Sequence, residues 1–276
     1  THLELDGFNL YTASLGEFNI YRRTKNDGIK SEPIFKTGNK SDSKITSLKR
    51  KGELVVGSRA MGTIFTYDDE NEYNEEFVRD SCDPILDVDF MDENFVTVSR
   101  SETNFHRLSS ELGMQTFDFV SSMNFGFSCI NFNPTGEKLL GVKSESLHIL
   151  DPTRVLITKS YLNRSQVFTT KWLSNSSFVF TSYSNPLTLI DLRTDFKRQE
   201  FSCGNFTATS VDYDGCYGLI YGTLLGMMVL CDLRNLRTFE RVFHLDTTTV
   251  CRHLISDESH LFVSTDNAIH LLNFNW

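Results

Sequence analysis

The sequence predicts an all-β fold, a seven-bladed β-propeller that forms one domain over residues 1–276. Three observations predict it: short apolar runs occur in pairs joined by tight turns, the pairs recur about every 42 residues, and no stretch has the period of a long amphipathic helix. Four short antiparallel strands in about 40 to 45 residues are typical of a propeller blade. A blade buries both faces only when neighbouring blades stack on it.

Each pair of runs is expected to form the second and third strands of one blade. The seven pairs are 10–14 with 18–21, 54–58 with 63–68, 95–99 with 105–108, 139–142 with 147–151, 178–182 with 187–191, 219–223 with 227–232, and 261–264 with 269–273. The third strands end their apolar part at positions 21, 67, 108, 150, 190, 231 and 273, and the spacings are 46, 41, 42, 40, 41 and 42 residues. A β-sandwich or two small barrels would not require so constant a period.

Further short runs supply the inner and outer strands. Inner strands are expected at 2–5, 45–48, 85–90, 129–132, 169–172, 210–213 and 250–254. Segments such as 33–36 and 116–119 leave room for outer strands. The chain ends directly after the third strand of the seventh blade, so we expect residues upstream of Thr1 to supply the outer strand that closes the ring.

Composition and charge restrict the classes of partner. Lys and Arg number 27 against 36 Asp and Glu, so the formal charge of -9 repels a phosphate backbone and disfavours general nucleic-acid binding. Apolar runs fall short of the roughly 18 residues of a membrane helix. Six cysteines are scattered without a CxxC pair, which is typical of reduced thiols in the cytoplasm or nucleus. Four of them lie in or beside strands and are expected in the core: Cys129, Cys216, Cys231 and Cys251.

Signatures of catalysis are absent from the sequence. There is no GxxxxGK[ST], GxGxxG, GxSxG or HExxH motif, and the seven histidines are scattered without the spacing of zinc ligands. His148 and His270 fall inside third strands, where a structural, hydrogen-bonded histidine is expected. We therefore predict a non-enzymatic protein with no catalytic residues, no metal and no cofactor.

At these repeats the chain resembles the WD-repeat family, although the Trp-Asp dipeptide is reduced to Tyr67-Asp68, Leu150-Asp151, Ile190-Asp191 and Cys231-Asp232. Within that family it is similar to the propeller of F-box/WD-repeat proteins of the dactylin type. Segments 54–59, 190–194, 260–264 and 269–274 carry this resemblance. It implies an F-box upstream of residue 1 that binds the Skp adaptor of a cullin-RING ubiquitin ligase, while the propeller receives a protein substrate. No F-box can be recognised in residues 1–276.

One set of positions could bind that substrate. The residues just after the second strands are Leu15, Arg59, Arg100, Lys143, Tyr183, Leu224 and Thr265, which a propeller would place around one mouth of its channel. Three consecutive blades are basic there, and the resemblance implies a site for a phosphorylated or acidic segment that includes Arg59, Arg100, Lys143 and Tyr183. A guanidinium group binds phosphate or carboxylate oxygens in bidentate fashion. Alternatively, the basic residues pair with acids such as Asp89 or Glu102, or face solvent.

Two Asp-Leu-Arg triplets, at 191–193 and 232–234, offer another reading. They resemble the Asp-x-Arg ending with which WD-repeat receptors contact the propeller adaptor of cullin-4 ligases, so Arg193 and Arg234 are candidate adaptor contacts. The preceding residues, Ile190 and Cys231, depart from that pattern, and each arginine could simply brace a strand end. The sequence thus predicts the substrate-recognition part of an SCF-type (F-box) E3 ubiquitin ligase. The alternatives are a cullin-4-type receptor and a non-ligase scaffold subunit of a multiprotein assembly.

Overall fold

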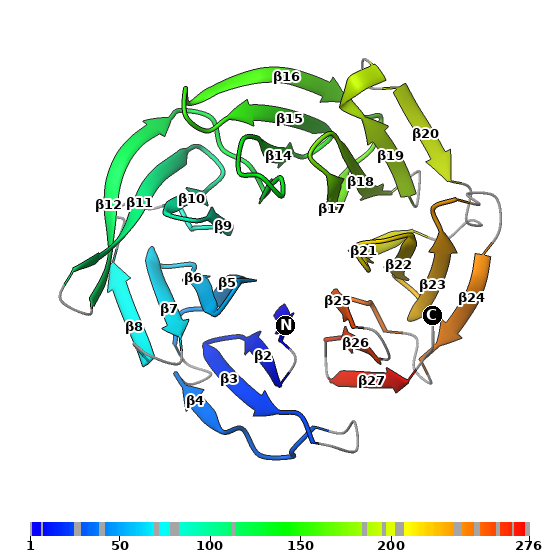
Figure 1. Cartoon of the computed structure of the whole chain (residues 1–276), viewed down its shortest axis with the longest axis horizontal. Helices are drawn as coiled ribbons and strands as arrows, with labels where there is room; N and C mark the ends of the chain where they lie inside the picture. Colours follow the sequence, from blue (N-terminus) through cyan, green and yellow to red (C-terminus); the bar gives the residue numbers. More distant parts are fainter. Residues whose placement is uncertain are drawn as a thin grey trace. The chain divides into compact units, whose positions relative to one another are not determined.

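The computed structural model describes residues 2–6, 8–24, 29–38, 42–68, 72–77, 83–111, 114–183, 187–194, 197–201, 207–234, 239–245, 249–257, 260–266 and 268–273. The strands within these ranges form seven antiparallel sheets, each built from consecutive strands (Figure 1). By their contacts the residues divide into an N-terminal unit, 2–143 with 148–160, and a C-terminal unit, 144–147 with 161–276. The two units are considered separately below.

The N-terminal unit holds the first three sheets and most of the fourth. Their strands are β1 (His2–Leu5), β2 (Asn9–Ser14), β3 (Glu17–Arg22) and β4 (Phe35–Thr37); β5 (Ile45–Lys51), β6 (Leu54–Arg59), β7 (Thr63–Asp68) and β8 (Glu72–Phe77); β9 (Asp87–Met91), β10 (Asn94–Val98), β11 (Thr103–Glu111) and β12 (Met114–Met123); and β13 (Cys129–Phe132), β14 (Leu139–Lys143), β15 (Ser146–Asp151) and β16 (Leu156–Leu162).

The C-terminal unit holds the other three sheets. Their elements are β17 (Val167–Ser174), β18 (Ser177–Ser182), β19 (Leu187–Asp191), the 3-10 helix η1 (Leu192–Thr194) and β20 (Lys197–Phe201); β21 (Ala208–Tyr213), β22 (Gly218–Thr223), β23 (Met227–Asp232) and β24 (Phe239–His244); and β25 (His253–Ser256), β26 (His260–Ser264) and β27 (Ile269–Asn273). The last sheet has three strands among the residues described. The closing strand upstream of Thr1 stays a prediction.

The seven repeats therefore have the blades that the sequence predicts, with the second and third strands within one or two residues of their expected ends, except that β11 continues three residues beyond 108. The inner and outer strands differ more: β12 runs over ten residues where 116–119 was the expected segment, and β9 begins at Asp87 rather than at residue 85. A bulge between Phe105 and His106 accommodates one extra residue of β12.

The hydrophobic core lies between neighbouring sheets. In the N-terminal unit, Phe18 of β3 and Phe65 of β7 are fully buried in one cluster, with ring centroids 5.2 Å apart. In the C-terminal unit, Tyr221 of β22 and Val179 of β18 share another cluster. Within each unit, neighbouring sheets thus bury their faces against one another, which is why one isolated blade is unstable.

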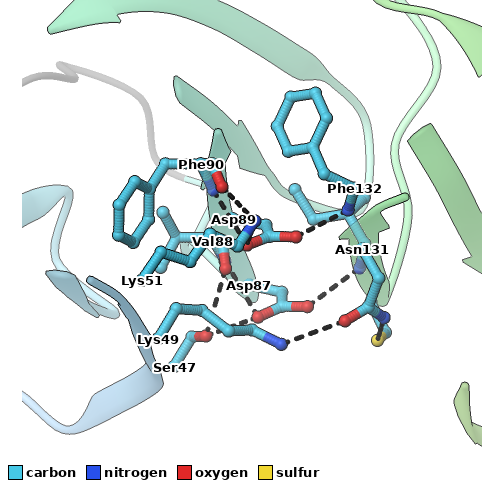
Figure 2. Close-up of polar contacts among 11 residues, drawn as sticks. Ser47, Lys49, Lys51, Asp87, Val88, Asp89, Phe90, Asn131 and Phe132 are labelled. Atoms are coloured by element: carbon cyan, nitrogen blue, oxygen red, sulfur yellow. Dashed lines mark hydrogen bonds and ion pairs between the residues drawn. The ribbon is translucent and has the colours of Figure 1, made fainter. Parts of the chain in front are cut away.

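Polar side chains also connect the inner strands β5, β9 and β13, as Figure 2 shows. Asp87 Oδ1 accepts a hydrogen bond from the Ser47 hydroxyl at 2.5 Å, and Asp87 Oδ2 accepts one from the Ile130 backbone N–H at 2.8 Å. Lys49 donates to Asn131 Oδ1 at 3.2 Å, so it reaches from β5 to β13. Burial alone would lower the pKa of Lys49, but the carboxylates of Asp87 and Asp89 outweigh it and raise that pKa. Lys49 is therefore charged.

Asp89, two residues further along β9, makes the same kind of connection (Figure 2). Its Oδ2 accepts a hydrogen bond from the Phe132 backbone N–H at 2.6 Å, and its Oδ1 lies 2.9 Å from the Lys51 ammonium of β5. Both carboxylates are buried, so removal of either would leave buried donors without acceptors.

The C-terminal unit repeats the device once among its described residues. Asp212 of β21 accepts hydrogen bonds from the backbone N–H and the hydroxyl of Ser256 on β25, both at 2.8 Å. Its other oxygen lies 2.8 Å from the Lys171 ammonium of β17. In both units, an inner-strand carboxylate therefore links the lysine of one neighbouring sheet to a main-chain amide of the other.

Candidate functional site

The candidate site residues lie on the turns that join the second and third strands of the sheets, and we call the set of these turns in each unit the rim of that unit. Hydrogen bonds hold these turns to the start of a neighbouring inner strand: Ala60 N–H donates to Lys44 C=O at 2.9 Å, and Leu224 N–H donates to Thr207 C=O at 3.1 Å. Bulges at the start of β5 and β21 accompany this geometry. Main-chain hydrogen bonds thus hold these turns in place, so substitution of a side chain in a turn leaves the bonds intact.

Arg59, at the end of β6, is a buried structural residue and does not offer its guanidinium to a ligand. Only 4% of the residue is exposed. Its Nη1 donates to the carbonyls of Gly16 and Ser43 at 2.9 and 3.0 Å, and its Nε lies 2.9 Å from Glu75 Oε1. The structure thus favours the alternative in which Arg59 pairs with an acid, although the acid is Glu75 rather than Asp89 or Glu102.

Arg100 and Lys143 behave differently, because both are exposed on the rim of neighbouring sheets. The loop between these sheets packs on both turns. A Cβ added to Gly126 would lie 2.2 Å from Ser99 O and 2.5 Å from Arg100 O, so that loop is pressed against the Arg100 turn. The Lys143 ammonium lies 3.8 Å from the centroid of the Phe125 ring. Segment 125–126 therefore brings the two predicted basic residues to one part of the N-terminal unit.

Tyr183 belongs to the C-terminal unit, where it also lies on the rim. Its side chain is exposed, as are Leu224 and Leu225 on the next sheet, and the Thr207 hydroxyl donates to Tyr183 C=O at 3.5 Å. Tyr183 therefore adjoins an apolar stretch of its own unit, whereas the basic candidates belong to the other unit.

Arg193 and Arg234 form matching pairs with the aspartates of their own triplets. Arg193 Nε and Nη2 lie 3.0 and 2.7 Å from the Asp191 oxygens, and Arg234 makes the same fork to Asp232 at 3.0 and 2.5 Å. These hydrogen bonds lower the pKa of both carboxyl groups. Arg234 also stacks over Tyr217, with its guanidinium carbon 4.5 Å from the ring centroid. The pairs brace the ends of β19 and β23 while keeping both arginines on the surface.

Histidine and cysteine positions mostly match their predicted structural roles. His148 is buried, with Nδ1 2.9 Å from the Ser160 hydroxyl, and burial together with the Lys143 charge lowers its pKa. Burial raises the pKa of Cys251 to about 11. The prediction for Cys216 is wrong: this residue is exposed, because it lies in the turn between β21 and β22.

The described residues hold no group of three His, Cys, Asp or Glu suited to a metal ion, and no helix long and apolar enough to cross a membrane.

Three rim residues had not been singled out as site candidates from the sequence. Leu15 is 52% exposed and Met61 is 72% exposed, and both lie on the rim of the N-terminal unit with the exposed Lys44 near them. Leu15 appears among the positions after the second strands, but an apolar residue in a turn carried no chemical signal. The signal that could have found it is the presence of a leucine where a tight turn favours Gly, Asn or Asp.

No protein-family model and no curated protein matches the chain. Among solved structures it is similar to the crystal structure of the WD40 beta propeller domain of Doa1, with a TM-score of 0.71 and 10% sequence identity; the match covers 96% of this chain and 89% of that chain. At this identity the likeness shows the fold alone, which is a seven-bladed β-propeller.

Proposed function

We propose that this propeller holds an anionic segment of a client protein against Arg100 and Lys143. The exposure of both basic side chains on neighbouring sheets, around segment 125–126, carries the proposal. A guanidinium binds a carboxylate or phosphate through two parallel hydrogen bonds, and an ammonium adds a point charge. Arg59 takes no part in this binding, because its donors are used inside the unit.

The finer proposal is that the chain is the substrate-recognition part of an SCF-type E3 ubiquitin ligase, which acts in the cytoplasm or nucleus. The support is the sequence resemblance to F-box/WD-repeat proteins. An F-box upstream of residue 1 would bind the Skp adaptor and through it the cullin, while the rim holds the client. The work is positional: client lysines are kept within reach of ubiquitin transfer.

A second candidate is a cullin-4-type receptor, and the paired surface arginines Arg193 and Arg234 favour it. Each arginine follows the third strand of its sheet by two residues and pairs with the last aspartate of that strand. The two neighbouring sheets therefore repeat the same surface feature. A scaffold subunit without any ligase is the remaining alternative.

The rim proposal is tested by binding of glutamate-rich and phosphoserine peptides to the full chain, measured by fluorescence polarisation. We expect Arg100→Ala with Lys143→Ala to weaken binding by about tenfold or more, since charge-assisted hydrogen bonds contribute roughly 1.5–3 kcal/mol. Arg107→Ala is the matched control, because Arg107 is exposed in the middle of β11, where it pairs with Asn94 at the end of β10 remote from the Arg100 turn. Equal affinity of the double variant and the wild type for every anionic peptide would reject the proposal.

The ligase proposal is tested with the full-length protein and purified adaptors. Retention of the Skp adaptor, lost when segments upstream of residue 1 are removed, is the result expected for an F-box receptor. Retention of the cullin-4 adaptor instead, abolished by Arg193→Ala with Arg234→Ala, would identify the cullin-4 class. Binding to neither adaptor would leave the scaffold role.

A further inference from the structure

The rim of the N-terminal unit presents two apolar side chains beside a cation. Leu15 lies in the turn between β2 and β3, and Met61 lies in the turn between β6 and β7, on sheets that are neighbours (Figure 1). Main-chain bonds place Lys44 between them: Ile45 N–H donates to Leu15 C=O at 2.5 Å, and Ala60 N–H donates to Lys44 C=O at 2.9 Å. We call Leu15, Lys44 and Met61 the apolar rim patch.

The patch sits on a rigid base. Met61 N–H donates to the Ser43 hydroxyl at 3.1 Å, and the buried Arg59 donates to the carbonyls of Ser43 and Gly16. Arg59 therefore ties both turns to the segment that carries Lys44. A surface held in this way needs little ordering when a partner binds, so a small contact area can give useful affinity.

Leu15 is unusual in its backbone conformation. It opens the two-residue turn between β2 and β3 with a φ of 53°. The corresponding first positions of two other turns, with φ of 51° and 53°, are occupied by Asp92 and Ser144, whose short polar side chains suit such turns. A leucine is strained in the left-handed region, and here its side chain is half exposed as well. Folding alone would favour Asn, Asp or Gly at this position, and strained residues of this kind are found at binding sites.

The charge of the patch defines its occupant. Lys44 is exposed on the segment whose main chain bonds to both turns, and Glu17, the acid at the end of the Leu15 turn, is already paired with Lys36 at 3.0 Å. Arg100 and Lys143 are basic on the rim of the same unit. A segment that fits this surface carries a bulky apolar side chain directly beside a carboxylate.

We infer that the client segment, whose binding rests on the function proposed above, is an acidic peptide that anchors one bulky apolar side chain on Leu15 and Met61 and a neighbouring carboxylate on Lys44. Burial of one leucine-sized side chain corresponds to a change in affinity of about tenfold or more. Charge alone would let this surface bind many acidic peptides, and the apolar anchor restricts binding to those with a bulky apolar residue beside the carboxylate.

The experiment is selection of a phage-displayed random peptide library on the full chain. Wild-type protein is expected to enrich peptides with Leu, Ile, Phe or Met next to Asp or Glu. Leu15→Asn with Met61→Ser is expected to lose the apolar preference, and Lys44→Gln the acidic one. For a synthetic enriched peptide, Leu15→Asn is expected to weaken binding by about tenfold.

Leu15→Asn has the advantage that it suits the left-handed turn, so its midpoint of thermal unfolding is expected to equal or exceed that of the wild type. Leu156→Asn is the matched control, because Leu156 is 41% exposed and begins the outer strand β16, at the end away from the rim. Acidic consensus peptides without an apolar position, or an apolar preference that survives Leu15→Asn with Met61→Ser, would overturn this inference and leave the proposed function standing. Failure to enrich any anionic peptide would overturn both.

Discussion

Replacement of Arg59 by alanine is expected to destabilise the protein rather than to weaken ligand binding. The substitution leaves the carbonyls of Gly16 and Ser43 without their charged donor, and hydrogen bonds to charged groups contribute about 1.5–3 kcal/mol each. Glu75 also loses its partner, but its side chain is 32% exposed, so water recovers part of that interaction and we assign it less than about 1 kcal/mol. The expected loss in the free energy of unfolding is therefore about 3–7 kcal/mol, whose lower part coincides with the range of about 3–5 kcal/mol for breaking a buried pair.

Urea unfolding followed by far-UV circular dichroism measures this change. Arg59→Lys is expected to recover only a small part of the loss, since one ammonium cannot reach both carbonyls and the carboxylate in the geometry of the guanidinium fork. Arg100→Ala is the comparison, and because Arg100 is exposed its effect is expected within about 0.5 kcal/mol of zero. If Arg59→Ala unfolds at the urea concentration of the wild type, Arg59 is not the structural residue described above.

Three further perturbations are expected to have measurable outcomes. Asp89→Ala removes the acceptor of a buried amide and of a lysine, so thermal unfolding is expected to show a loss of about 3 kcal/mol, and a loss below about 0.5 kcal/mol would contradict the role of the carboxylate. The pKa of His148 is lowered below its ordinary value of 6.5, so the unfolded chain takes up the proton at a higher pH than the folded protein does. The contribution of His148 to the free energy of unfolding should be constant above about pH 7 and fall as the pH drops through that ordinary value. His148→Gln should remove this part of the pH dependence. Iodoacetamide is expected to modify Cys216 in the native protein and Cys251 only after unfolding, which peptide mass spectrometry would check; equal native labelling would show that Cys251 is accessible.

The blades were predictable because their signal is local. Paired apolar runs such as 54–58 and 63–68 contain both the strand pattern and the turn, and their regular spacing indicates stacking of like units. The length of β12 was not predictable, since a bulge opposite His106 depends on the pairing with β11 rather than on the sequence of β12 alone.

The site was harder to predict, because side-chain exposure depends on segments that are distant in sequence. Arg59 and Arg100 occupy equivalent positions after second strands, yet only Arg59 is covered, by carbonyls from residues 16 and 43 and by an acid from β8. Acidic and apolar residues alternate in the sequence of the inner strand β9. The amides that donate hydrogen bonds to its carboxylates belong to β13, some 43 residues away, and the sequence of β9 does not indicate them. The charge pattern of the sequence therefore indicated where basic residues lie in the turns. The partners of Arg59 and of the β9 carboxylates could be identified only from the fold.

The inner-strand carboxylates have a consequence for how far the repeats can diverge. Asp87, Asp89 and Asp212 accept hydrogen bonds from main-chain amides, and every residue except proline supplies such an amide whatever its side chain. The sheet that donates these amides can consequently change the side chains of its inner strand, within the limits of core packing, while the link to its neighbour persists. A propeller joined in this manner can keep its sheet-to-sheet links while the side chains of its repeats diverge in sequence.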